Sequence, residues 1–333
     1  MFRQKYFFLS SFLCFFLIFV SVLPTNAAAI KTSGDFKYTI SNSRVTIKKY
    51  TGKASNVIVP SSINGKTVDS IDASAFYKNS AIKSLTLSSG ITTMDYASIY
   101  KCSKLTTLIL PKTLLDITSQ KNFSTFKGCD CLKYIQVDPK NKHFYSKDNI
   151  LYEYVTSPAN VLLKKVTICY YPHTKKAKSF QLPENLAWMP TDNYITKNGT
   201  IFNNPYLKSF SLCTPKNLSA KKKILKTRAK ISTGDNSTKT VVKKSFRITL
   251  KWNRISPASG YYLYEASKKN GKYKKIATIY QSYNASYPEK ASYVLYRTYD
   301  KKFCYYRLQA FTNGYKNGKK SVITSGYTSS FRI

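Results

Sequence analysis

A recurring unit in the first two thirds of the chain limits the possible folds more than any other feature. Each copy has apolar residues at i, i+3 and i+5, and the last two alternate as in a short strand with one buried face. The copies are Ala81–Leu87, Lys104–Leu110, Cys131–Val137 and Tyr206–Leu212. Leu87, Leu110 and Val137 lie 23 and 27 residues apart, within the range of leucine-rich repeats. Because one such unit buries its apolar face only against the next, the pattern predicts a solenoid.

Short segments upstream of these strands are predicted to form one turn of α- or 3₁₀-helix. They are Ile71–Asn79, Met94–Cys102 and Phe126–Cys129. Each repeat is therefore expected to combine a strand with a helical turn.

These units resemble the BspA-like leucine-rich repeat family, which combines an isoleucine-rich strand, a proline, an alanine-phenylalanine pair and a Gly-Cys step. Val57–Ile71, with its Asn-Gly turn, is similar to an early unit of that family, and His143–Tyr152 is similar to its inserted hairpin. The resemblance covers about residues 33–213. Residues 113–125 and 184–200 lack the alanine-phenylalanine pair, so the solenoid is expected to be short and irregular there. The resemblance implies an extended surface for adhesion to host proteins or other cells.

The pattern changes from about Thr214, where alternating runs replace the repeats. These runs are Phe246–Trp252, Tyr262–Tyr264, Tyr273–Ile279 and Tyr306–Ala310. Short alternating strands separated by Gly, Asn and Ser turns predict a β-sandwich. The fold class expected is mainly β, with a short irregular leucine-rich repeat solenoid over 30–213 and an all-β sandwich over 214–333.

The second region resembles fibronectin type III-like, immunoglobulin-like modules in the spacing of Trp252, Pro257–Tyr261 and Gly271–Tyr273. The resemblance implies that Trp252 is a core residue. Cys304 stands where such modules have a corner tyrosine, so either Tyr305 or Tyr306 takes that role or the register shifts by one.

The first 29 residues predict an export signal. Arg3 and Lys5 precede the apolar run Tyr6–Leu23, and Ala27 and Ala29 mark the expected cleavage region. The run approaches membrane-spanning length, so an uncleaved anchor helix is the alternative. With no second apolar stretch, we expect a secreted or surface-associated protein that is held non-covalently and has no integral membrane segment after cleavage.

A large excess of positive charge accompanies this signal. The chain has 54 Lys and Arg against 15 Asp and Glu, a net charge of +39. Such a charge concentrates polyanions at the surface, and salt weakens the effect. After export, the expected partners are anionic cell-wall polymers, glycans and surface proteins, and nucleic acid is not expected; a merely solubilising surface is the alternative. The candidate polyanion-binding residues, in a segment interpreted as a basic strand-loop region or linker, are Lys221, Lys222, Lys223, Lys226, Arg228, Lys230, Lys243 and Lys244.

The residues of known catalytic and metal sites are scarce. His143 and His173 are the two histidines, and neither has the spacing of a metal ligand or of a catalytic base. Phosphate loops, nucleophile elbows and zinc-protease motifs are absent from the sequence. We therefore predict a non-catalytic protein with no cofactor, metal or catalytic residue.

Six cysteines follow the signal, an even number on an oxidising route, so disulfides are one interpretation. Cys102 and Cys129 each lie three residues before a repeat leucine, where a buried small residue is typical of the family that the repeats resemble. Free core thiols are the preferred interpretation, with a bond between stacked repeats as the alternative.

Three functional hypotheses remain. The first is an adhesion or binding protein whose solenoid engages a host or cell-surface ligand. The second is a structural protein held by charge on anionic wall polymers, and the third is an accessory subunit of a secreted enzyme. The 28 tyrosines also allow an exposed aromatic platform for glycans, although tyrosine equally fills strand faces in a sandwich.

Overall fold

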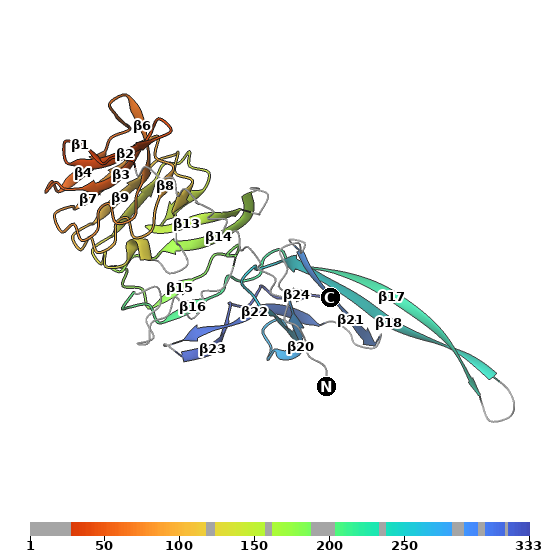
Figure 1. The fold of residues 1–333 in the computed structure, drawn as a ribbon. Helices are drawn as coiled ribbons and strands as arrows, with labels where there is room; N and C mark the ends of the chain where they lie inside the picture. The colour runs from red at the N-terminus through yellow and green to blue at the C-terminus, as the bar shows by residue number, and fades with distance from the viewer. Residues whose placement is uncertain are drawn as a thin grey trace, which may run out of the picture.

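In the computed structural model, a solenoid is joined to a second β-rich part, and a long hairpin projects from the latter (Figure 1). The residues described are 28–117, 124–156, 162–187, 204–232, 238–281, 290–298, 304–316 and 319–333. Most of the predicted signal, Ala27 included, lies outside them, and Ala29 is exposed just before the first strand.

Two parallel sheets form the solenoid, and successive repeats add one strand to each. The first sheet has the order β4-β7-β9-β11, with β4 (Asn56–Val59), β7 (Ser84–Leu87), β9 (Thr107–Leu110) and β11 (Tyr134–Val137). The second continues as β3-β6-β8-β10, with β3 (Arg44–Tyr50), β6 (Lys66–Ile71), β8 (Thr93–Met94) and β10 (Asp116–Ile117). Val57, Leu85, Leu108 and Ile135 stand in register and are buried. The predicted stacking of repeats is confirmed.

Antiparallel strands close the N-terminal end of this array. β1 (Lys31–Ser33) pairs with β2 (Phe36–Ser41), which pairs with β3, and the short β5 (Ser62–Ile63) pairs with β6. The β2–β3 turn has positive φ at Asn42 and Ser43, as does the β5–β6 turn at Asn64 and Gly65. Two consecutive residues with positive φ make a type I′ turn, which suits the twist of a tight hairpin.

The predicted inserted hairpin is present after the fourth aligned strand. β12 (Phe144–Lys147) and β13 (Ile150–Thr156) pair around Asp148 and Asn149, both of which have positive φ, and β14 (Leu162–Tyr170) adds a further antiparallel strand. Parallel pairing then resumes between β15 (Ser179–Gln181) and β16 (Ser209–Ser211). The copy predicted at Tyr206–Leu212 is therefore a repeat strand, separated from the others by the insertion.

The prediction of helical turns is wrong for most repeats. Within the described residues there is no α-helix, and the single 3₁₀-helix is Ser124–Phe126. Elsewhere alternate backbone N–H groups bond to the next repeat, as in Phe76 N–H to Ser98 O at 2.7 Å and Lys78 N–H to Tyr100 O at 2.9 Å, while those between them close single turns, as in Tyr77 N–H to Ser74 O at 3.0 Å. Because the alternate N–H groups donate to a neighbouring repeat, they are not available for the hydrogen bonds of a helix.

The C-terminal part consists of two sheets. One has the order β17-β18-β21, with β17 (Ser219–Ser232), β18 (Thr238–Asn253) and β21 (Lys290–Thr298). The other has β20 (Lys274–Tyr280), β19 (Gly260–Ala266) and β22 (Tyr305–Lys316) in that order, and β22 also pairs with β23 (Lys319–Thr324) and β24 (Phe331–Arg332). Trp252 is 1% exposed and its ring lies 5.1 Å from that of Tyr261, so its predicted place in the core is confirmed.

One apolar cluster extends across residue 213. It contains Val166, Leu182 and Phe210 from the last repeats together with Trp252 and Leu308 from the C-terminal sheets. β16 also pairs with β22, antiparallel, at Ser209 and Lys316. The last repeat strand is thus covered by the C-terminal part. Among the residues described, no helix is long and apolar enough to cross a membrane.

Candidate binding surfaces

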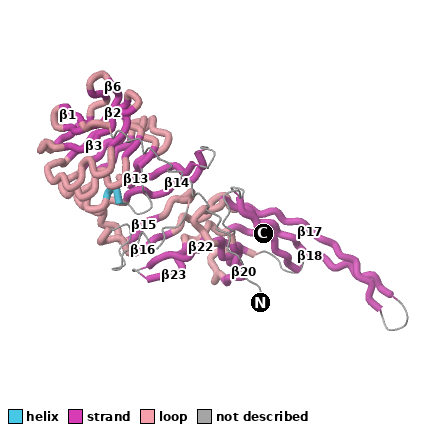
Figure 2. Tube along the Cα trace, viewed as in Figure 1, coloured by secondary structure: helices cyan, strands magenta, loops and turns pink. Residues whose placement is uncertain are grey.

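The first candidate surface is the hairpin of β17 and β18, here called the basic arm. Its strands pair without interruption, from the pair formed by Ser219 and Lys251 at the base to the pair formed by Ser232 and Thr238. β21 accompanies β18 only from Ser245 onward, so the outer half of the arm is a two-stranded ribbon. Figures 1 and 2 show this ribbon extending away from the rest of the protein.

The basic arm has cations and, over the strands described, no acidic residue. Ten of the 15 acidic residues of the chain lie between Asp35 and Glu184 instead. All eight predicted polyanion-binding residues lie on the arm and are exposed. The pairing of β17 with β18 brings Lys243 and Lys244 beside Thr227 and Lys226, which are distant from them in sequence. The segment that was interpreted from the sequence as a strand-loop region or linker forms a hairpin of two paired strands.

Like charges face one another across the arm. Lys226 stands directly opposite Lys244, and Lys223 directly opposite Arg247. Such pairs destabilise an isolated hairpin. One cation lies over an aromatic ring, since Lys222 Nζ is 3.7 Å from the centre of the Phe246 ring. An anion bound between these cations would relieve the repulsion.

The pleat of the strands distributes the cations over both faces of the ribbon. Lys226, Arg228, Lys230 and Lys244 share one face, because paired residues and alternate residues point to the same side. Lys239 and Lys243 belong to the other face. A ligand that contacts one face leaves the cations of the second in water.

The second candidate surface is the outward face of the β4-β7-β9-β11 sheet, here called the strand face. Its outward positions hold uncharged side chains, of which Ile58 and Tyr134 are 66% and 43% exposed. The full set is Asn56, Ile58, Ser84, Thr86, Thr107, Ile109, Tyr134 and Gln136. Lys133 places its ammonium group 4.9 Å from the centre of the Tyr134 ring. An uncharged surface with exposed aromatic and aliphatic groups is suited to protein contacts.

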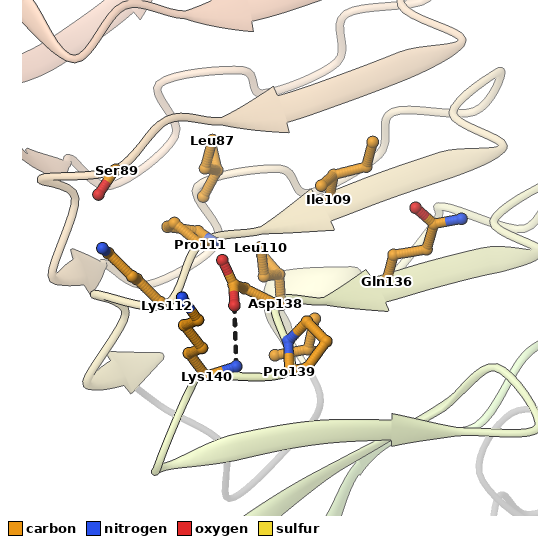
Figure 3. A pocket seen from close by; sticks show the side chains of 11 residues that line it. Leu87, Ser89, Ile109, Leu110, Pro111, Lys112, Gln136, Asp138, Pro139 and Lys140 are labelled. Carbon is orange, nitrogen blue, oxygen red and sulfur yellow. Dashed lines mark hydrogen bonds between the residues drawn. The ribbon is translucent and has the colours of Figure 1, made fainter.

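A shallow groove of about 550 Å³ lies at the end of the strand face (Figure 3). Apolar side chains of Ile109 and Pro139 line it together with Lys112 and Lys140. Asp138 Oδ1 accepts a hydrogen bond from the backbone N–H of Lys140 at 2.8 Å, which fixes the turn that closes the groove. The groove extends the strand face with a polar rim.

A stack of aromatic and basic side chains follows the repeats along another edge. The rings of Tyr77 and Tyr100 lie 5.6 Å apart and are within 8° of parallel. Lys78 and Lys101 place their ammonium groups 5.1 and 5.3 Å from these rings. Tyr77 is 41% exposed, so part of the tyrosine content is available to a ligand.

Three asparagines that the sequence patterns did not indicate hold turns, two before repeat strands and one before the inserted hairpin. Asn141 donates to Pro111 O and Leu114 O at 2.8 and 3.0 Å and accepts from the N–H groups of His143 and Phe144 at 2.8 and 2.7 Å. Asn79 and Asn204 each accept from the N–H groups two and three residues later. The signal that could have revealed them is an Asn three residues before an apolar repeat position.

Two cysteines serve the same structural purpose. Cys102 Sγ donates to Phe76 O at 3.0 Å, and Cys129 Sγ donates to Ile99 O at 2.9 Å, so each thiol binds the preceding repeat. Both are buried, as is Cys169, where burial raises the pKa of the thiol well above its ordinary value. Cys131 is exposed. The described cysteines form no disulfide in this structure, but the thiols of Cys102 and Cys129 interact with each other across adjacent repeats. The preference for free thiols therefore stays a prediction.

Ionisable groups do not gather into a metal-type cluster anywhere in the described part of the chain. His173 Nδ1 lies 3.2 Å from Asp130 Oδ1 at the surface. In the C-terminal part, Glu265 Oε1 accepts hydrogen bonds from Tyr306 OH at 2.8 Å and Arg297 Nε at 3.1 Å. Burial acts to raise the pKa of Glu265, but these two donors together hold it below its ordinary value. Tyr306 therefore takes a buried hydrogen-bonding role, with a carboxylate as acceptor.

The comparisons with known proteins concern the repeat region. Residues 46–161 match the family described as BspA type leucine rich repeat region, in six copies. This range lies within the part of the chain for which the sequence resemblance was identified. Over these residues the chain is similar to leucine-rich repeats of the BspA type. No curated protein matches the sequence.

Solved structures of leucine-rich repeat proteins also match. A leucine rich repeat protein of T. pallidum is 20% identical over 56% of this chain and 84% of its own, with a TM-score of 0.37. A leucine rich cell surface protein of Faecalibacterium prausnitzii is 14% identical over 56% of this chain and 71% of its own, with a TM-score of 0.24. The pneumococcal vaccine antigen PcpA is 16% identical over 56% of this chain and 64% of its own, with a TM-score of 0.21.

Proposed function

We propose that this protein is a non-catalytic binding and adhesion protein of a bacterial cell surface. The observation that carries the proposal is the presence of two surfaces of opposite character in one chain. The outward positions of the strand face hold no charged residue, and Lys133 reaches it at Tyr134, whereas the basic arm has eleven Lys and Arg residues on its described strands and no acid. Separate surfaces allow one chain to hold two ligands at once.

The strand face is the part proposed to engage a protein ligand. Interfaces exclude charge at their centre and favour aromatic residues, as this face does with Tyr134 and Ile58. The BspA-type repeats support an adhesive role, because the family displays such surfaces for binding.

The basic arm is the part proposed to retain the protein on anionic cell-surface polymers. Its exposed cations raise the local concentration of such polymers, and the interaction weakens as salt screens it. Retention of this kind fits the proposed export by the first 29 residues and a non-covalent location at the surface. A purely structural wall protein remains the alternative, in which the strand face has no ligand.

We also propose that residues 214–333 form a fibronectin type III-like sandwich. The strand order supports this, because β17-β18-β21 on one side and β20-β19-β22-β23 on the other is the arrangement of such two-sheet domains. In this proposal the module presents the basic arm as an extension of its first two strands.

A pull-down of residues 30–333 against host matrix proteins, mucin and purified cell wall at two ionic strengths tests the proposal. Binding to a protein ligand should persist at the higher salt and be lost in an Ile58→Asp/Tyr134→Asp variant. Binding to cell wall should be lost at the higher salt and be unaffected by that variant. If every interaction disappears together in salt, the purely electrostatic alternative is correct. Co-purification with an active enzyme would favour an accessory subunit instead.

A further inference from the structure

We infer that the basic arm binds double-helical nucleic acid, inserting as a two-stranded ribbon into a groove of the duplex. This inference rests on the proposed polyanion binding of the arm and names one polymer class. It revises the sequence-based expectation that nucleic acid is not a partner, which rested on export alone. Duplex DNA released from lysed cells occupies the same compartment as exported proteins.

The shape of the outer arm is the first support. Beyond Ser245 the arm has two strands, from Lys226 paired with Lys244 to Ser232 paired with Thr238. Seven paired positions at a strand rise of about 3.3 Å give a ribbon about 20 Å long. The major groove of B-DNA, about 12 Å wide, admits a two-stranded ribbon. A third strand would make the element too wide, and β21 ends before this segment.

The distribution of charge is the second support. Lys226, Arg228, Lys230 and Lys244 lie on one face, while Lys239 and Lys243 lie on the other. The face that carries four cations is the one that would enter a groove. A groove has a phosphate backbone along each side, so Lys226, Arg228 and Lys230 of β17 lie toward one backbone and Lys244 of β18 toward the other.

An exposed apolar side chain among the cations is the third support. Val242 is 46% exposed and lies opposite Arg228, on the same face as Lys226, Lys230 and Lys244. A ligand made only of charged and hydroxyl groups gains nothing from it. Base edges and thymine methyl groups provide apolar contacts at the floor of a groove.

The experiment measures fluorescence anisotropy of a labelled duplex DNA of about 24 base pairs with residues 30–333, over salt from about 50 to 300 mM. The test variant is Lys226→Gln/Arg228→Gln/Lys230→Gln/Lys244→Gln. The matched control removes four exposed solenoid cations, Lys31→Gln/Lys37→Gln/Lys49→Gln/Lys104→Gln. Thermal unfolding confirms that both variants fold. Unlabelled single strand and linear poly(glycerol phosphate), at equal phosphate, compete with the duplex.

The inference predicts that the arm variant weakens duplex binding at least about 30-fold and flattens the salt dependence by about one unit of slope per contacted phosphate. The control variant should weaken binding less than about 3-fold, since long-range charge alone is screened. Competition by single strand and by poly(glycerol phosphate) should be at least about 10-fold poorer than by duplex.

Equal weakening by the two variants, or no duplex binding by the unaltered protein, would overturn the inference. Poly(glycerol phosphate) that competes as well as duplex would overturn it as well, while leaving the proposed retention on wall polymers in place. If neither polymer binds the unaltered protein, the proposed polyanion binding fails together with the inference.

Discussion

Replacement of Asn141 by alanine should destabilise the protein more than the loss of one side chain of that size normally does. The side chain is 8% exposed and makes four hydrogen bonds, all to backbone groups. Two of them bind carbonyl oxygens of the preceding repeat, and two hold the turn that starts β12. Asn141 therefore joins the repeat array to the inserted hairpin.

The magnitude follows from the groups left behind. A buried backbone group without a partner costs about 1 to 3 kcal/mol, and water that enters the vacated space recovers part of this for the carbonyls. We expect Asn141→Ala to lower the free energy of unfolding by about 3 to 5 kcal/mol, a large part of the 5 to 15 kcal/mol typical of a folded protein.

Urea unfolding followed by circular dichroism and by tryptophan fluorescence measures this loss. Asn79→Ala is the matched control, because Asn79 also accepts two turn N–H groups but is less buried and donates to Gly52 O at 3.4 Å. We expect about 1 to 2 kcal/mol for the control. A loss below about 1 kcal/mol for Asn141→Ala, or equal losses for both variants, would refute the reasoning.

Three further outcomes are expected. Because hydrogen bonds from Tyr306 and Arg297 keep the folded-state pKa of Glu265 low, its ionised form stabilises the fold above its unfolded pKa of about 4.3, and this contribution is lost as the pH falls through the folded value. The Tm of the unaltered protein should therefore fall more on acidification than that of Glu265→Gln; parallel falls would contradict this. A thiol reagent should modify exposed Cys131 first and, after unfolding without reductant, all six cysteines of residues 30–333, whereas a lower final number would indicate disulfides. Gly260→Ala should cost about 1 to 3 kcal/mol in urea unfolding, because the added methyl would lie 2.8 Å from the Phe311 ring and in contact with Ile279 O; unchanged stability would show that this contact relaxes freely.

The solenoid could be predicted because its signal is local and repeated. Leu85, Leu108 and Ile135 occupy the same position in successive units, so periodicity alone aligned them as the structure does. The hairpin around Asp148 and the core position of Trp252 were implied by the resemblances to known families, and the structure has both. Each motif that carried these expectations lies within a short segment of the chain.

The features that the sequence missed depend on distant pairings. Lys226 and Lys244 form a pair only because β17 and β18 align in one register, and a run of lysines does not distinguish a strand from a linker. Helical turns were expected where N–H groups in fact bond to the next repeat, as Phe76 does to Ser98. Secondary-structure propensity describes a segment in isolation, whereas these hydrogen bonds form between segments that are distant in sequence.

The closure of both ends of the repeat array has a consequence for how such a chain can change in length over evolution. Antiparallel strands β1 and β2 cover the first repeats, while β22 and the apolar core of the C-terminal part cover the last. A unit duplicated at either end would expose an apolar face and displace its cover. A unit duplicated between β7 and β9 would meet the same neighbours on both sides that each existing unit meets. Gains and losses of repeats should therefore fall in the interior of the array, with the two ends inherited unchanged.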